Sequence, residues 1–363
     1  MKAPLRDRLL ALPKAELHVH LLGAIPRGVL VELFGRHPPA EWLPRLKWPV
    51  RWFFGRQRHL RRFLRRRSIT EDDVAGLFAY RSFKQFLATY FFASCLVRQE
   101  ADLRDLIRGV LDGLVAQNVV YAELTVSPPG YRFNGIPLDR IAVCMAEAAD
   151  RSDIRVQWIV DPVRDMGPRK ALKLLRRIID LDVPGVAGIT LGGSEHKHPP
   201  APFAGVYALA RDNGLRLTVH AGEARGPKSV WDALRVLQAE RIGHGVRAVE
   251  DSELVSCLAV NQVPLEICPT SNVRTGVVKS YQAHPVRGLF DAGVPVSISS
   301  DDPTFFRTTL TDEFVHLYEA GFTEYELLDL LRNGFRHAFL PPEDAEAYLA
   351  ALDRVVEATS HGK

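Results

Sequence analysis

The chain has 363 residues, of which 47% are hydrophobic and 25% are charged. This composition is that of a globular protein and excludes a disordered chain, a collagen-like fibre and a small disulfide scaffold. The 47 Lys and Arg residues exceed the 43 Asp and Glu residues by only four, and this excess does not by itself indicate a nucleic-acid or membrane partner. The charge balance is compatible with an anionic substrate but does not require one.

Targeting and redox features of the sequence predict a soluble cytoplasmic protein. No apolar run approaches the roughly 18 residues that a membrane span needs, and charged residues interrupt the short leucine stretch near the N-terminus before a signal-peptide core forms. The cysteines have neither CxxC spacing nor the density of a disulfide framework, so we expect mostly buried thiols in a reducing compartment. These cysteines are Cys95, Cys144, Cys257 and Cys268.

Short β-rich segments alternate with helical patterns along the chain, which is typical of a parallel sheet. Eight strands are expected, at residues 16–20, 119–126, 155–160, 186–191, 216–220, 241–244, 264–268 and 294–299. Eight strand–helix units in a chain of this length predict an α/β fold of the (β/α)8 TIM-barrel type, whose active site lies at the C-terminal ends of the strands. The competing open, doubly wound sheet would carry a Gly-rich turn after its first strand, and ELHVHLLG is not such a turn.

Apolar residues at helical spacing predict helices that cover the sheet. Such stripes occupy residues 103–115, 171–179 and 230–237, and Asn118 stands where the first of these helices would be capped. No internal repeat or low-complexity linker divides the chain. We therefore expect one domain over residues 1–363, with a helical insertion at about residues 21–118 between the first two strands.

Polar side chains follow several of the expected strands. In the first strand, His18 and His20 are two residues apart and therefore point the same way. An HxH pair alone is a weak indication of a metal site, but the fifth strand ends in HAGE, the sixth in GHG and the eighth in DDP. These stretches would converge on one barrel mouth.

Histidine nitrogens and a carboxylate oxygen are the ligands of a catalytic Zn²⁺, which keeps one position for water and lowers the pKa of that water. His18, His20, His220 and one Asp of the 301–302 pair supply such a set. The fourth strand, GITLGG, carries no Lys or Glu near its end that would bridge a second ion, so one metal ion per chain is expected. Glu223 would reach the substrate, and His244 would either orient or deprotonate the metal-activated water.

Five motifs in order resemble the signature of the adenosine deaminase family, a zinc-dependent branch of the amidohydrolase superfamily. They are PKAELHVHLLGAI, TVHAGEA, ERIGHGV, CPTSN and SISSDDP, and they extend from Pro13 to past Pro303. The resemblance implies a (β/α)8 barrel that releases ammonia from a purine by hydrolysis. It also implies a zinc ion held by His18, His20, His220 and Asp301.

The same resemblance implies roles for the other residues of the site. Glu223 would protonate the ring nitrogen next to the reacting carbon, and His244 would act on the attacking water, with Asp301 beside it. Asp302 would hydrogen-bond the imidazole edge of the purine, and the backbone N–H of Gly193 would also meet the purine.

Three positions depart from the pattern of adenosine-specific members. Leu22 stands where an Asp or Asn is understood to hold the ribose 5′-hydroxyl, and an apolar side chain would leave that hydroxyl unpaired. Ser194 replaces the Asp of the family's LAGDE motif, and Thr125 stands where an Arg often follows the second strand's Glu123. These departures resemble the branch that acts on 6-amino-6-deoxyfutalosine, an intermediate of the futalosine route to menaquinone, in which a chain ending in a carboxyphenyl group replaces the 5′-hydroxyl.

The insertion contains a segment, residues 51–67, with eight arginines, no acidic residue and interleaved aromatics. We expect it over the barrel mouth, mostly as a solvated basic surface, with one or two arginines as candidate partners of a substrate carboxylate. Nucleic-acid binding is a third interpretation of this segment, and the small net charge of the protein argues against it. In the same insertion, the aromatics Phe83, Phe86, Tyr90 and Phe91 are expected in the core, with some as candidates for the pocket.

Other polar residues receive a structural interpretation. Glu16 and Arg241 are expected to form ion pairs in the barrel, and Glu266 is as compatible with a structural role as with a functional one. His196 and His198 lie in a Pro-flanked loop that would support a metal poorly. The histidines with no chemical neighbours in the sequence are expected to be structural, namely His284, His316 and His337.

The sequence therefore predicts a cytoplasmic, mononuclear zinc deaminase of a small-molecule purine nucleoside, with neither a nucleic-acid nor a membrane partner. The favoured reaction converts aminodeoxyfutalosine to futalosine, and the alternative is deamination of adenosine in purine salvage. Hydrolysis of an ester or amide by the same zinc water is a further enzymatic alternative. A catalytically inactive nucleoside-binding protein is the alternative from another class.

Overall fold

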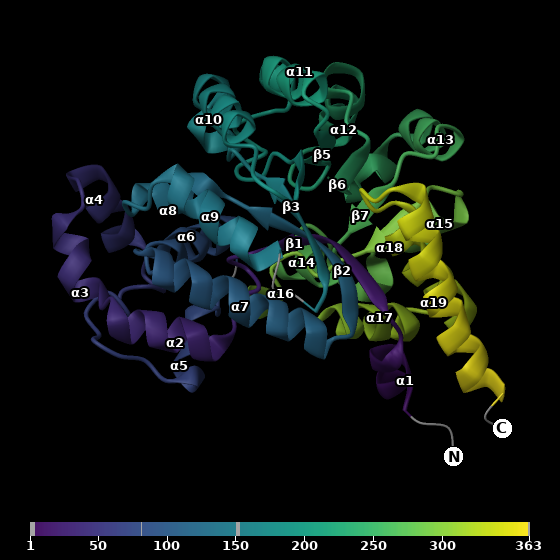
Figure 1. Ribbon diagram of the computed structural model, residues 1–363, viewed down its shortest axis with the longest axis horizontal. Helices are drawn as coiled ribbons and strands as arrows, with labels where there is room; N and C mark the ends of the chain where they lie inside the picture. Colours follow the sequence, from purple (N-terminus) through teal and green to yellow (C-terminus); the bar gives the residue numbers. More distant parts are fainter. Residues whose placement is uncertain (1–3, 81, 150–152, 362–363) are drawn as a thin grey trace.

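Eight parallel strands form a barrel in the computed structural model of the protein, which describes residues 4–80, 82–149 and 153–361 (Figure 1). The strands are hydrogen-bonded to one another in their order along the chain. Their bounds are β1 Lys14–His20, β2 Val119–Val126, β3 Arg155–Val160, β4 Val186–Ile189, β5 Arg216–Ala221, β6 Arg241–His244, β7 Leu265–Ile267 and β8 Val296–Ile298.

A parallel bridge between Val19 and Asp301 joins β1 to the segment that follows β8. The N–H of Asp301 donates to the carbonyl of His18 at 2.9 Å, and the N–H of His20 donates to the carbonyl of Asp301 at 2.8 Å. Because the last strand returns to the first, the sheet is a barrel and not an open doubly wound sheet. The predicted fold class is confirmed.

All eight predicted strands are present, and their ends differ from the prediction by up to two residues. Strand β1 begins two residues early, at Lys14, whose buried ammonium group donates to the carbonyls of Leu9 and Leu12 and so ties the strand to the preceding helix. Strands β7 and β8 are shorter than expected at both ends.

Helices connect the strands and cover the barrel, and Figure 1 labels them in chain order. Their bounds are α1 Leu5–Ala11, α2 Arg27–Arg36, α3 Pro39–Trp42, α4 Trp48–Arg56, α5 Glu71–Leu77, α6 Phe83–Ser94, α7 Glu100–Ala116, α8 Pro128–Phe133, α9 Leu138–Ala149, α10 Pro168–Leu181, α11 Ala204–Asp212, α12 Pro227–Asp232, α13 Ser252–Val260, α14 Pro269–Arg274, α15 Val286–Asp291, α16 Pro303–Phe306, α17 Leu310–Glu319, α18 Glu324–Arg336 and α19 Pro342–His361.

The predicted apolar stripes face the core with two exceptions. Helix α7 buries its stripe from Leu103 to Leu114, but Val115 is 40% exposed because it lies at the margin of that face, one residue before the helix ends. Asn118 has a positive φ of 54°, the left-handed conformation that ends many helices. The third stripe differs more, because α12 continues as a π-helical turn, Ala233–Leu237, which apolar periodicity does not distinguish from an α-helix.

Helices α2 to α7 form the insertion between β1 and β2, so the predicted long helical insertion is confirmed. In Figure 1, α2 to α6 gather at the end of the molecule opposite the two chain termini. The described cysteines are free thiols, three of them buried and Cys257 half-buried, as expected. Among the residues that the structure describes, no helix has both the length and the apolarity that a membrane span requires.

Candidate active site

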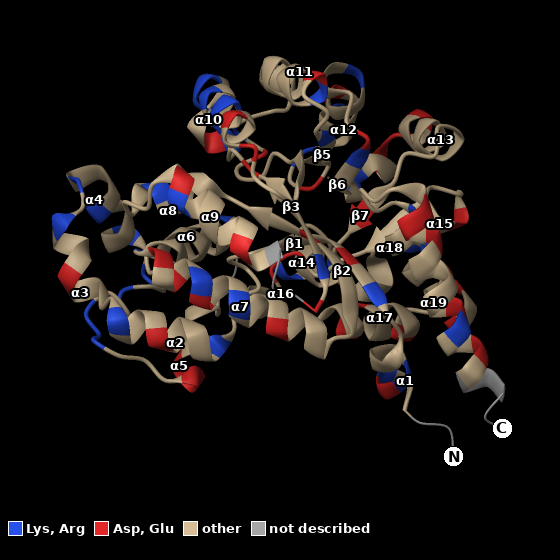
Figure 2. Cartoon of the chain, viewed as in Figure 1, with Lys and Arg blue, Asp and Glu red and all other residues tan. Residues whose placement is uncertain are grey.

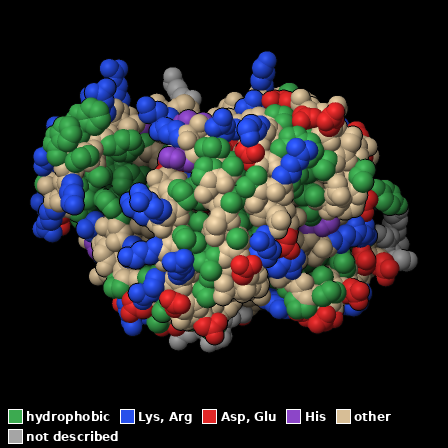
Figure 3. All heavy atoms as spheres, turned by 90° about the horizontal axis from the view of Figure 1, so that it is seen from above, with side chains coloured by type: hydrophobic (Ala, Val, Ile, Leu, Met, Phe, Trp, Pro, Cys, Tyr) green, Lys and Arg blue, Asp and Glu red, His purple; other side chains and the backbone are tan. Residues whose placement is uncertain are grey.

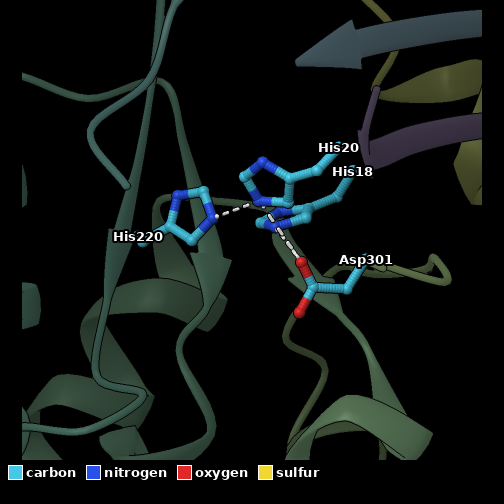
Figure 4. A group of neighbouring side chains, drawn as sticks. All are labelled: His18, His20, His220 and Asp301. Atoms are coloured by element: carbon cyan, nitrogen blue, oxygen red, sulfur yellow. Dashed lines mark hydrogen bonds and ion pairs between the residues drawn. The ribbon is translucent and has the colours of Figure 1, made fainter. Parts of the chain in front are cut away.

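Four predicted ligands meet at the mouth of the barrel. His18 and His20 lie at the end of β1, His220 lies on β5, and Asp301 follows β8 (Figure 4). The bridge between β1 and the β8 segment brings Asp301 beside both β1 histidines. The Asp301 backbone has a positive φ of 61°, a strained conformation for a non-glycine residue that turns the chain into the site.

The ligand atoms of these four buried residues all lie within 4.8 Å of one another. The Nε2 atoms of His20 and His220 are 3.1 Å apart, and Oδ1 of Asp301 lies 3.3 Å from Nε2 of His20 and 3.5 Å from Nε2 of His18. Nε2 of His18 is buried without a hydrogen-bond partner among the described residues. Three imidazoles and a carboxylate with an unpartnered nitrogen fit one divalent transition-metal ion.

Neighbouring groups orient three of the four predicted ligands. Nδ1 of His18 is 2.7 Å from Oε2 of Glu266, and Nδ1 of His220 is 3.1 Å from Oγ1 of Thr190. The hydroxyl of Ser271 donates to Oδ2 of Asp301 at 2.6 Å. Such second partners fix the tautomer and direction of a metal-binding imidazole. Neither Thr190 nor Ser271 could be assigned a role from the sequence, although Ser271 lies in the CPTSN motif.

Arg241 lies below this cluster and pairs with Glu266 and Glu123, so the expected ion pairing of Arg241 is confirmed. Burial opposes ionisation of Glu266, but the charge of Arg241 and the hydrogen bond from His18 lower its pKa to about 2. Glu266 thus contacts a predicted metal ligand as an anion, which joins its structural and functional roles. The expected ion pair of Glu16 is absent among the described residues, since its carboxylate instead accepts hydrogen bonds from Ser300.

Glu223 lies on the loop after β5, three residues beyond His220. A second carboxylate supports this loop, because both oxygens of Glu195 accept hydrogen bonds, from the N–H groups of Gly222, Ala224 and Arg225 and from the Ser229 hydroxyl. Burial raises the pKa of Glu223 to about 8, with the charges of Asp301 and Glu195 acting in the same direction. Glu223 is therefore protonated near neutral pH and can donate a proton.

His244, at the end of β6, faces the same space. Its Nε2 lies 3.8 Å from Oε2 of Glu223 and 3.9 Å from Oδ2 of Asp301. Its backbone also has a positive φ, of 64°. Its Nδ1 lies 3.3 Å from Nδ2 of Asn272, a fully buried amide that the sequence analysis did not single out.

Asp302 lies beside the ligand cluster, and its Oδ1 is buried without a hydrogen-bond partner among the residues the structure describes. Burial and the charge of Asp301 raise the pKa of Asp302 well above its usual range. Gly23 allows this arrangement, because a Cβ there would lie only 1.7 Å from Oδ1 of Asp302. An unpartnered buried carboxyl oxygen that borders a cavity is a group for a ligand to contact.

A cavity of about 1110 Å³ opens above these residues. Leu22, Gly193 and Ser194 line it together with Glu223, His244 and Asp302, so the predicted substrate contacts share one space. The four insertion aromatics, from Phe83 to Phe91, also line it, so they belong to the pocket as well as to the core packing. Figure 3 shows hydrophobic side chains gathered with Lys and Arg at the end of the molecule that carries α4.

The arginines of residues 51–67 form the mostly solvated basic surface that was expected, but they do not supply the candidate partners of a substrate carboxylate. None of these eight arginines lines the cavity, and seven of them are exposed, because helix α4 turns Val50 and Phe53 inward instead. The cations that do line it come from α6, α8, α10 and the loop after β4, and none has a carboxylate partner among the described residues. They are Lys84, Arg132, Lys170, Lys173 and Lys197. Figure 2 colours the Lys and Arg positions of the chain blue, among them those of α10.

The remaining histidines divide between surface and site. His196 lines the cavity and His198 lies 3.9 Å from Asp165, but neither belongs to a metal-competent group in the described part of the chain. His316 stacks on Tyr281. His284 was expected to be only structural. Its Nε2 is 3.1 Å from Oδ1 of Asn272, the residue whose amide contacts His244.

The family profile described as "Adenosine deaminase" matches residues 69–356. The chain belongs to the adenosine deaminase family. Members of this family are hydrolytic deaminases that act on C–N bonds of adenine- or adenosine-like compounds, so this chain is an enzyme of that class.

Relatives of this adenosine deaminase family member include adenine deaminases, which are the more numerous, and an aminodeoxyfutalosine deaminase. The chain is 36% identical over 348 residues to the adenine deaminase of Rhizobium leguminosarum bv. trifolii (strain WSM2304), covering 94% of this chain and 99% of the relative. It is 33% identical over 358 residues to the aminodeoxyfutalosine deaminase of Streptomyces avermitilis, covering 96% and 92%.

Solved structures agree with the barrel of this family member. Adenine deaminase from Arthrobacter aurescens superposes with a TM-score of 0.82 at 28% identity, over 96% of this chain and all of that one. The N6-methyl-AMP deaminase of Arabidopsis thaliana superposes with a TM-score of 0.79 at 23% identity, over 97% and 99%, and shows the same fold.

Proposed function

We propose that this family member deaminates a 6-aminopurine that carries a large substituent with an anionic end, with 6-amino-6-deoxyfutalosine as the substrate and futalosine and ammonia as the products. The observation that carries this proposal is the cavity, about 1110 Å³ in volume, with an aromatic wall and five cations that have no carboxylate partner among the described residues. Pockets for drug-sized ligands are roughly 300–1,000 Å³, so a free purine base would leave most of this space unfilled.

The metal of the proposed reaction is one zinc ion, held by His18, His20, His220 and Asp301. The proposal rests on their close grouping and on the unpartnered Nε2 of His18. A solved relative from Burkhoderia, described as bound to Zn, is 24% identical and agrees in fold. When bound, such an ion lowers the pKa of water so that it attacks at neutral pH.

The chain's own residues supply the remaining chemistry. Protonated Glu223 donates its proton to the ring nitrogen next to the reacting carbon, which makes that carbon more electrophilic. The water oxygen forms a bond to this carbon. One proton of the water passes to the exocyclic nitrogen, whose bond to the carbon breaks so that it leaves as ammonia, and the other proton restores the Glu223 carboxyl. His244 contacts the attacking water, while Asp302 and the backbone of Gly193 hold the purine.

Specificity in this proposal comes from the residues around the 5′ side of the ribose. Leu22 is 2% exposed and presents an apolar surface to the cavity, which Ser194, also buried, lines as well. A 5′-hydroxyl would lose its hydrogen bonds there, whereas a carbon chain would not. The insertion aromatics can pack against a phenyl ring, and the unpaired lysines and arginine can attract its carboxylate.

Adenine is a second candidate substrate. The 36% identical relative from Rhizobium leguminosarum is named adenine deaminase, which favours a free base. Adenosine is the third. The two nucleosides share the purine but only aminodeoxyfutalosine has the aromatic carboxylate, whereas adenine has neither ribose nor arm.

An ester analogue tests the proposed anionic end directly. The methyl ester of aminodeoxyfutalosine keeps the size and the phenyl ring of the substrate but removes its charge. We expect kcat/KM for ammonia release to fall about tenfold or more with the ester, mainly through KM. Lys170→Gln with Lys173→Gln should lower kcat/KM for the acid but not for the ester. Equal rates for acid and ester in the wild type would contradict the proposed anionic recognition.

A further inference from the structure

A hydrogen-bonded network of three buried side chains extends from the cavity wall into the protein. Its members are His244, Asn272 and His284. Asn272 lies on α14, in the CPTSN motif, and is fully buried, while His284 precedes α15 and is 4% exposed. Oδ1 of Asn272 is 3.1 Å from Nε2 of His284, and Nδ2 of Asn272 is 3.3 Å from Nδ1 of His244. The proposed function uses His244 but neither of the other two residues.

The backbone of Val286, at the end of the network away from the cavity, determines which atoms of the network donate and which accept. The backbone N–H of Val286, the first residue of α15, donates to Nδ1 of His284 at 3.1 Å. A backbone N–H can only donate, so Nδ1 of His284 must carry a lone pair. The proton of this neutral imidazole is therefore on Nε2, which donates it to Asn272.

The amide of Asn272 transmits this pattern of donors and acceptors to the active site. Because His284 donates, the atom of Asn272 that faces it must be the carbonyl oxygen, and the amide nitrogen faces His244. The amide N–H donates to Nδ1 of His244, so Nδ1 again carries a lone pair. The proton of neutral His244 is then on Nε2, the nitrogen that faces Glu223 and Asp301.

We propose that Asn272 and His284 are positioning residues that hold His244 in the tautomer protonated at Nε2, so that His244 donates a hydrogen bond into the cavity and does not take a proton from the attacking water. This inference rests on the proposed function and deepens it, because the sequence left open whether His244 orients or deprotonates the water. An Nε2–H group can orient the water oxygen through its lone pair, but it has no lone pair of its own to accept a proton.

Burial acts in the same direction as the hydrogen bonds. It lowers the pKa of His284 to about 4, so this imidazole is neutral at pH 7. Protonation of His284 at Nδ1 would also set two N–H groups against each other at Val286. The network of His244, Asn272 and His284 therefore has one consistent arrangement of protons.

The isosteric substitution Asn272→Asp tests this arrangement. A carboxylate has the shape of the amide but only accepts, so it takes a hydrogen bond from His284 and a second from Nδ1–H of His244. The variant should move the proton of His244 from Nε2 to Nδ1, while both histidines remain hydrogen-bonded to residue 272. We expect kcat to fall about a hundredfold, the scale of one lost active-site donor, with KM within about twofold.

The decisive readout is the tautomer, measured from the ¹⁵N chemical shifts of protein labelled in histidine, in samples of equal metal content. The resonances of His244 are assigned by their loss in His244→Gln. We expect Nε2–H in the wild type and Nδ1–H in Asn272→Asp. A wild-type His244 protonated at Nδ1 would overturn the inference, and so would an Asn272→Asp variant with unchanged tautomer and kcat.

Two further variants separate positioning from folding. His284→Leu should lower kcat because Asn272 is then free to rotate, and His284→Gln should restore it in large part, since the glutamine amide can donate to Oδ1 of Asn272. Asn333→Asp is the matched control, because the Asn333 amide donates to the carbonyl of Val296, away from the cavity lining. It should leave the tautomer unchanged.

The tautomer measurement needs no substrate. A protein with His244 protonated at Nε2 that deaminates none of the tested purines would refute the proposed function and leave the proton arrangement intact. A protein that deaminates a purine with His244 protonated at Nδ1 would refute the inference alone.

Discussion

Removal of the Arg241 side chain should lower both the free energy of unfolding and the affinity of the protein for its metal ion. Arg241 is 2% exposed and its guanidinium contacts Glu123, Glu266 and the carbonyl of His337. Arg241→Met keeps much of the volume but leaves two buried carboxylates without a counter-charge. Breaking a buried ion pair from one side costs about 3–5 kcal/mol of unfolding free energy.

For a chain of 363 residues, this loss corresponds to a decrease of about 4–7 °C in the midpoint of thermal unfolding. The effect on the metal follows from Glu266, because without Arg241 its pKa rises and its hydrogen bond to His18 weakens. We expect zinc affinity to fall about tenfold to a hundredfold. Calorimetry of the apo-protein gives the first quantity, and competition with a chelator gives the second.

Two controls show whether the buried charges are the cause. Arg155→Met breaks a partly exposed pair with Asp344 and should cost less than about 1 kcal/mol. Glu123→Gln in the Arg241→Met background removes one of the unpaired carboxylates and should recover part of the stability. An Arg241→Met protein within about 1 kcal/mol of the wild type, with unchanged zinc affinity, would refute this reasoning.

Other predictions concern the reaction. Glu223→Gln should bind a purine inhibitor but lose about 10²–10⁴-fold in kcat, as measured by ammonia release. Because the raised pKa of Glu223 is about 8 and its protonated form is the active one, wild-type kcat/KM should fall as pH rises through about 8. Leu22→Asn should reduce the preference for aminodeoxyfutalosine over adenosine by about tenfold or more. A strong chelator should abolish activity, and zinc should restore it.

Each of these predictions has a contradicting result. Full turnover in Glu223→Gln would exclude Glu223 as the proton donor, and a rate that stays constant from pH 7 to pH 10 would exclude its titration as the limiting ionisation. An unchanged ratio in Leu22→Asn would show that Leu22 does not contact the 5′ side. Activity that persists in protein free of metal would exclude the metal-dependent mechanism.

The barrel and the residues of its mouth could be predicted because they depend on local patterns. Strand periodicity places His18 and His20 on one face, and a barrel brings the ends of distant strands together. Ordered motifs then identified His220, Glu223 and Asp301 as one group. Spacing and fold class therefore predicted three histidines and one Asp of the 301–302 pair, and the resemblance to the adenosine deaminase family then selected Asp301.

The parts that could not be predicted depend on contacts between segments that carry no joint pattern. Nothing in the sequence links His284 to Asn272, because the geometry of the turn before α15 decides which ring nitrogen the backbone of Val286 meets. The basic composition of residues 51–67 made one or two of their arginines candidate partners of a substrate carboxylate. The cavity instead receives its cations from Lys170 and other isolated residues, because the packing of each helix decides which side chains face inward.

The most direct test of the proposed function is a competition among aminodeoxyfutalosine, adenosine and adenine in one reaction, on protein of known metal content. The relative rates of product formation give the ratios of kcat/KM without separate calibration. We expect aminodeoxyfutalosine to exceed each of the other two by about a hundredfold or more, on the scale of an unpaired polar group and an unfilled pocket. Faster consumption of adenine or adenosine would contradict the proposal and show that the large cavity does not select the substrate.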